Sequence, residues 1–223
     1  MFSNINIFEV IQIVIIIFVS IGFHEFAHAI VSYKLWDLTP KLQWRVTLNP
    51  VSHIDPIWWI LILFMILTWW WIGRWKPVEI NPSNYKNPAK WEFLVAIAWP
   101  AMNILLATIS ILFIFIYAKL SWFDLINSYS WDRFSNFFLT FAVVNLWLAV
   151  FNLIPIWPLD GFSIVKIFSF KLAHKMMEYR NIISVIVLIL ILGPTWNWFL
   201  NALSTIRYFL FDIIFSFFSA IFY

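Results

Sequence analysis

The sequence of 223 residues contains no cysteine, and this absence limits the structures and sites that the chain can form. Disulfide bonds and thiolate metal ligands are both excluded, so a metal ion would have to be bound by histidine and carboxylate side chains. Charged residues are also scarce, at 11% of the chain against about 25% in a soluble globular protein. With 63% hydrophobic residues, this composition excludes a soluble domain and indicates an integral membrane protein.

The net charge of +3 is small, and the basic residues lie mainly between the apolar runs. They bear on membrane topology rather than on nucleic-acid binding, so we expect the lipid bilayer as a partner and no nucleic acid. The first apolar segment lacks a basic leading region and a small-residue cleavage site. We therefore expect it to stay in the protein instead of being removed as a signal peptide.

Long apolar runs define the expected architecture: 7–33, 57–73, 91–118, 134–154, 181–193 and 196–222. They predict an all-α polytopic membrane protein, a bundle of about five transmembrane helices in a single integral membrane domain, residues 1–223. The run 57–73 has the minimum length for a span and follows a proline, so we expect it to be re-entrant. Alternation of polar and apolar residues in 34–56 predicts a short membrane-associated β-hairpin.

The most informative stretch lies inside the first apolar run, where His24, Glu25 and His28 form the pattern His-Glu-x-x-His. In a helix the two histidines lie four residues apart on one face and can bind one metal ion, while Glu25 is placed to handle a proton of water. Ionisable groups at membrane depth cost about 2.5 kcal/mol or more each unless they have partners. Three together therefore favour a metal site over a chance pattern.

A second polar group follows the fourth run, where Pro155 and Pro158 interrupt helical hydrogen bonding before Asp160 and Gly161. Irregular backbone at membrane depth is tolerated only next to protein or a water-filled cavity. Alone, Asp160-Gly161 is typical of an exposed turn. Beside His-Glu-x-x-His, it indicates a third metal ligand.

These two motifs together resemble those of the site-2 proteases, a family of intramembrane zinc metalloproteases. The resemblance covers roughly residues 20–165 and also includes Leu48-Asn49-Pro50, His53-Ile54-Asp55-Pro56, Lys76-Pro77-Val78, Asn81-Pro82, Pro100-Ala101-Met102-Asn103 and Asn152-Leu153-Ile154-Pro155. It implies a catalytic core of about 7–165, followed by C-terminal helices at about 181–222.

The resemblance implies one zinc ion per chain on His24, His28 and Asp160, with Glu25 as general base and Asn152 as a polar group near the scissile carbonyl. The implied substrate is a transmembrane protein, cleaved in or near its membrane segment. A catalytically inactive membrane scaffold and, less in keeping with Glu25, a small transporter are the alternatives. The sequence leaves the oligomeric state open.

Metal ligands must share one depth in the membrane, and this requirement constrains the threading of the chain. If 57–73 is re-entrant, three loops with eleven Lys and Arg share one face and the other face carries three. The positive-inside rule then places the active site toward the cytoplasmic side.

Glycine is rare, with 4 residues against 16 tryptophans, whereas average usage of about 7% would give about 16 glycines. Sequences similar to this family usually carry glycine where this chain has Trp36, Trp44, Trp58 and Trp99. An aromatic belt explains tryptophans near an interface but not Trp99 within an apolar run. We hypothesise that the organism reads one codon as glycine and that this codon has been translated as tryptophan in the printed sequence.

Overall fold

The computed structural model describes residues 7–53, 81, 84–122, 128–157, 159–192 and 195–223. All regular elements within these residues are helices, as the sequence predicts. The chain divides into two compact units, residues 1–99 and 100–223, and each is described by itself.

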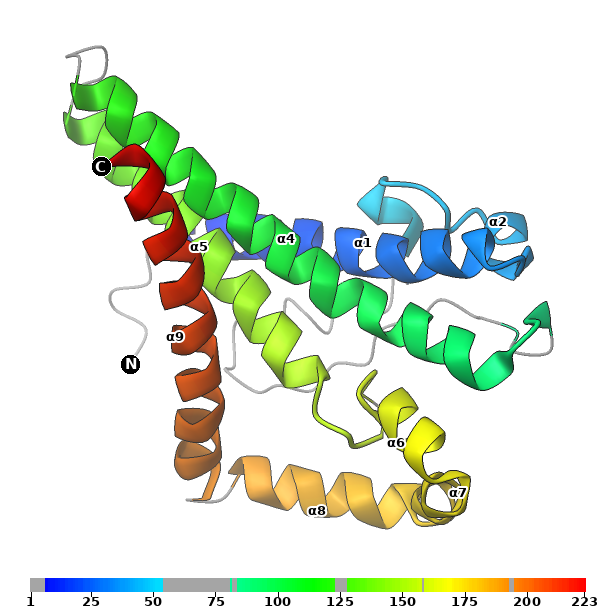
Figure 1. Ribbon diagram of the computed structural model, residues 1–223. Coiled ribbons are helices and arrows are strands. Elements are labelled where there is room, and N and C mark those ends of the chain that lie inside the picture. Colours follow the sequence, from blue (N-terminus) through cyan, green and yellow to red (C-terminus); the bar gives the residue numbers. More distant parts are fainter. Residues whose placement is uncertain (1–6, 54–80, 82–83, 123–127, 158, 193–194) are drawn as a thin grey trace. The chain divides into compact units, whose positions relative to one another are not determined.

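Helices long and apolar enough to cross a membrane are Ile7–Lys34, Lys90–Ser121, Trp131–Asn152 and Asn197–Phe222. They correspond to α1 (Ile7–Lys34), α4 (Pro88–Trp122), α5 (Ser128–Asn152) and α9 (Thr195–Phe222) (Figure 1). The predicted multi-pass membrane protein is therefore confirmed. The expected re-entrant run 57–73 lies outside the described residues, and the expected total of about five spans stays a prediction.

The first unit contains α1, the short helices α2 (Thr39–Leu42) and η1 (Pro50–His53), and the beginning of α4. Both short helices contact α1. The β-hairpin expected in 34–56 is not found within the described residues 34–53. Instead, Pro40, whose φ suits the first turn of a helix, lies in the first turn of α2. Trp44 has φ 57°, which an extended strand cannot include.

A buried carboxylate, Asp37, fixes the chain just after α1. It is fully buried and accepts hydrogen bonds from Ser32 Oγ (3.0 Å), Thr39 N (3.0 Å), Thr39 Oγ1 (2.6 Å), Asn81 N (2.8 Å) and Asn84 Nδ2 (2.8 Å). Ser32 also bonds the hydroxyl of Tyr85 at 2.7 Å, and burial raises the pKa of Tyr85 to about 12. The end of α1 is thus tied to the segment that leads into α4.

In the second unit α5 packs along α9, as Figure 1 shows for the light-green and red helices. The core of this unit joins α4, α5 and α9 through buried side chains: Ala107, Ile111, Phe115, Ala142, Leu146 and Phe218. Between α5 and α9 the chain forms α6 (Phe162–Phe168), α7 (Phe170–Glu178) and α8 (Arg180–Leu192). The predicted C-terminal runs at 181–193 and 196–222 correspond to α8 and α9.

Candidate metal centre

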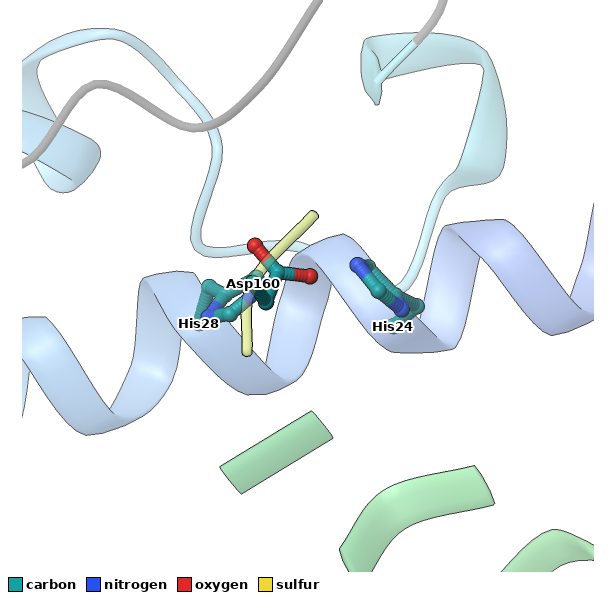
Figure 2. Close-up of side chains that lie close together, drawn as sticks. All are labelled: His24, His28 and Asp160. Atoms are coloured by element: carbon teal, nitrogen blue, oxygen red, sulfur yellow. The ribbon is translucent and has the colours of Figure 1, made fainter. Parts of the chain in front are cut away.

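The two histidines of the His-Glu-x-x-His motif lie one turn apart on the same face of α1 (Figure 2). Their ring centroids are 5.1 Å apart and the rings meet edge to face, at 80°. The helix forms here because the surrounding run is apolar and free of proline, and its polar residues are spaced four apart. The predicted pairing of His24 and His28 is therefore present in the first unit.

His28 is held by a backbone group of α4. Its Nδ1 lies 3.0 Å from the carbonyl oxygen of Val95. Because a carbonyl can only accept a hydrogen bond, Nδ1 of His28 is the donor in this contact. This arrangement is typical of metal-binding histidines, whose second nitrogen donates to a carbonyl or carboxylate.

Glu25 is buried on the same helix, with 5% of its surface exposed. Its Oε1 lies 3.9 Å from Nε2 of His24, so the carboxylate lies beside the His24 ring. Carboxylates in such surroundings are among the side chains that act as proton acceptors in active sites.

Two features of the first unit near these residues were not expected from the sequence. The indole of Trp99 packs on His24, with ring centroids 4.6 Å apart and the rings inclined at 37°. Trp99 is completely buried, and its Nε1 has no hydrogen-bond partner within the part of the chain that the structure describes. Neither this contact nor the Val95 carbonyl has a signature in the sequence.

His53, which belongs to one of the motifs that resemble the site-2 proteases, lies in η1 and is 2% exposed. Its Nε2 lies 3.0 Å from the carbonyl oxygen of Thr47. Burial lowers the pKa of His53, and this outweighs the Thr47 carbonyl and the charge of Glu25, which raise it. His53 is therefore neutral at pH 7, as a packed residue beside α1.

Asn152 and Asp160 lie in the second unit, on either side of a folded-back loop. Asn152 is the last residue of α5, and its carbonyl accepts a hydrogen bond of 2.7 Å from the amide of Gly161. A Cβ at position 161 would run into the carbonyl oxygens of Leu153 and Ile154, so glycine is required at this close approach. The loop therefore returns Asp160 to the end of α5, directly before α6.

The chain offers these polar groups from two places: His24, Glu25 and His28 on α1, and Asn152 and Asp160 at the end of α5. His24, His28 and Asp160 each offer one atom that can bind a metal ion (Figure 2). Asn103, one turn after Trp99 in α4, is fully buried, and neither atom of its amide has a partner within the described residues.

Comparisons with known proteins identify relatives along most of the chain. The model of peptidase family M50 matches residues 73–194. YwhC of Bacillus subtilis (strain 168), provisionally named a zinc metalloprotease, is 34% identical over 212 residues, which cover 94% of this chain and 92% of that protein. Rip2 of Mycobacterium tuberculosis (strain ATCC 25618 / H37Rv), with the same provisional name, is 27% identical over 203 residues, or 87% of this chain and 71% of that protein. No solved structure matches the chain.

The membrane helices and the buried His-Glu-x-x-His helix define the class as a membrane metallopeptidase. The chain belongs to peptidase family M50, the site-2 protease family. It is an intramembrane zinc metalloprotease, as the motifs of the sequence predict, and zinc is its cofactor.

Proposed function

We propose that the chain hydrolyses a peptide bond within, or at the edge of, a transmembrane helix of a substrate protein. In this proposal His24, His28 and Asp160 bind the zinc ion and Glu25 is the general base. The observation that carries it is the motif on α1, in which His24 and Glu25 are buried and the carbonyl of Val95 accepts a hydrogen bond from Nδ1 of the partly buried His28.

The residues fit a zinc ion by the chemistry of their donor atoms. Two imidazoles and one carboxylate are a ligand set of catalytic zinc sites, which keep a further position open for water or substrate. With no cysteine in the chain, a carboxylate is the natural third ligand, and Asp160 follows two prolines in a loop at the end of a spanning helix. Asp160 is therefore the ligand that we propose to join the two histidines of α1.

Zinc, when bound, supplies Lewis-acid chemistry: it lowers the pKa of water toward about 7 and polarises the scissile carbonyl. Glu25 accepts a proton from the attacking water and gives it to the leaving amine. What supports this role is the burial of Glu25 on α1, with its Oε1 3.9 Å from Nε2 of His24. The substrate helix must unwind before cleavage, because its carbonyls are engaged in internal hydrogen bonds.

Asn152 is proposed to donate a hydrogen bond from its side-chain amide to the oxyanion that develops on the scissile carbonyl. What supports this role is its place at the end of α5, where its own carbonyl binds Gly161 beside Asp160. The same hydrogen bond that shapes the Asp160 loop thus keeps Asn152 next to it.

The general base is tested by replacing Glu25 with glutamine, which keeps the size of the side chain but cannot accept the proton. Cleavage of a model single-span membrane protein with helix-breaking residues in its span should fall by about 10²- to 10⁴-fold. Zinc content should stay at the wild-type level. Glu178→Gln, at an exposed position of α7, is the matched control and should cleave normally. Full activity of Glu25→Gln would contradict the assigned role.

A further inference from the structure

Two tryptophans adopt a backbone conformation that belongs to glycine. Trp36 has φ 73° and Trp44 has φ 57°, and these are the positive φ angles found within the described residues. L-residues avoid this left-handed region because Cβ approaches the following carbonyl oxygen, and bulky residues enter it only as outliers. Both residues therefore carry backbone strain that glycine would not have.

The hydrogen bonds around Trp36 identify the position as a helix C-terminal cap. After α1, the amide of Asp37 donates to the carbonyl of Ser32 and the amide of Trp36 donates to the carbonyl of Tyr33, both at 3.1 Å. This pair of bonds is the Schellman motif, and Trp36 occupies its left-handed residue. Glycine is the usual residue at that place.

The same motif recurs after α2. The amide of Arg45 donates to the carbonyl of Pro40 at 2.8 Å, and the amide of Trp44 donates to the carbonyl of Lys41 at 3.0 Å. Trp44 again occupies the left-handed residue of the cap. Two separate helix ends thus have tryptophan at the left-handed position of the cap, where glycine is the usual residue.

The side chains at these two caps offer little to offset the strain. Trp36 is 71% exposed and Trp44 is 84% exposed. The indole of Trp36 meets the ammonium of Lys86 at 5.9 Å, at the edge of cation–π range. A residue held in a strained conformation normally persists because its surroundings fix it, and packing of these indoles does not do so.

Trp99 differs from the two exposed cap residues, because its side chain is completely buried. It lies within the helix α4. Its indole Nε1 is buried without a hydrogen-bond partner within the described residues, whereas buried indole N–H groups usually have one. It also lies against His24, at a place where α1 and α4 approach each other closely enough for His28 to bond Val95. Small residues are typical of such close approaches between membrane helices.

We infer that positions 36, 44 and 99 are glycine in the natural protein. The organism reads the codon at these positions as glycine, whereas the printed sequence translates it as tryptophan. The scarcity of glycine in a membrane protein, 4 residues against 16 tryptophans, has the same explanation. Trp58, the fourth position expected from the sequence, lies outside the described residues. Trp131 is not part of this assignment: it lies within the helix α5, and its indole stacks on Tyr117 at 5.7 Å and 11°.

Glycine at position 99 would change the surroundings of His24 in the candidate metal centre. This consequence rests on the proposed function. With glycine at position 99, the ring of His24 loses the indole that packs on it, and the space beside a proposed zinc ligand opens. A tryptophan at position 99 would obstruct it.

The test is peptide mass spectrometry of the protein purified from the membranes of its natural host, read beside the codons of the gene. Glycine is expected at positions 36, 44 and 99 and tryptophan at position 131. One codon should be shared by the three glycine positions and differ from the codon at 131. Tryptophan in the peptides at 36, 44 and 99 would overturn the inference.

Variants of the chain test the same assignment through stability. Trp36→Gly and Trp44→Gly should each raise the midpoint of thermal unfolding by about 2–4 °C, because they relieve a left-handed residue. The control Trp131→Gly should lower it, since it removes a stacked ring. Lowered midpoints for both cap variants would contradict the assignment.

Trp99→Gly separates the glycine assignment from the proposed function. If both hold, cleavage of the model single-span substrate increases and the zinc content does not fall. If the peptides contain glycine at position 99 but the variant cleaves no better, the glycine assignment stands and the proposed role of this site is contradicted.

Discussion

Asp37 shows how a single charged side chain can hold the end of a membrane helix. Burial raises its pKa, but the hydrogen bonds from Thr39, Asn81 and Asn84 lower it by more, and the net pKa lies below the ordinary aspartate value. The carboxylate is thus stabilised in its charged form, where it accepts five donors.

Because the folded-state pKa of Asp37 is lowered, its contribution to stability is present above the unfolded pKa and is lost as pH falls through the folded pKa. Asp37→Asn should lower the free energy of unfolding at pH 7 by about 1.5–3 kcal/mol. Thermal unfolding in detergent should show the gap between wild type and variant closing below about pH 4. Asp132→Asn, at an exposed position, is the control. A gap that persists at low pH would show that the charge of Asp37 is not responsible.

At the residue scale, the sequence is informative where chemistry repeats at a helical spacing. His24, Glu25 and His28 were predicted from their spacing and lie together on α1. The partner of His28 was not predictable, because a backbone carbonyl 67 residues away has no side-chain signature. The contact of Trp99 with His24 was missed for a similar reason: sequence does not tell which face of α4 meets α1.

Among the elements, α5 and α9 pack through a core that includes Leu146, which is fully buried. Leu146→Ala should lower the free energy of unfolding by about 2–3 kcal/mol, the lower part of the range for buried leucines, because lipid also solvates apolar groups. Leu139→Ala, on the same helix but 41% exposed, should cost much less. Equal losses in thermal unfolding of the two variants would contradict this packing.

The long helices were predictable as elements because 20 or more apolar residues have few other structures available in a membrane. The predicted runs 91–118 and 134–154 correspond to α4 and α5 with small shifts at the ends. The prediction of a strand in 34–56 was wrong for the described residues, since Pro40 and the left-handed Trp44 override the alternating pattern. Short segments are decided by such local backbone effects more than by periodicity.

At the scale of the whole molecule, the proposal that the active site faces the cytoplasm follows from the charges of the loops. The absence of cysteine makes it directly testable, because each cysteine variant carries a single thiol. Lys41→Cys and Lys86→Cys should react with an impermeant maleimide from the cytoplasmic side, and Asp132→Cys from the opposite side. Labelling of positions 41 and 86 from opposite faces would contradict the re-entrant threading of 57–73.

That the 223 residues form a single integral membrane domain also stays a prediction. The proposed site provides its physical reason. Ligands from α1 and from the loop after α5 bind one ion only if these two parts of the chain assemble into one body.

The central claim is that Asp160 joins His24 and His28 in one zinc site, and metal content tests it without any substrate. The purified, detergent-solubilised protein should contain about one zinc ion per chain. Asp160→Ala should lose most of the zinc, and the exposed control Asp132→Ala should retain it. Zinc unchanged in Asp160→Ala would remove Asp160 from the site and contradict the account.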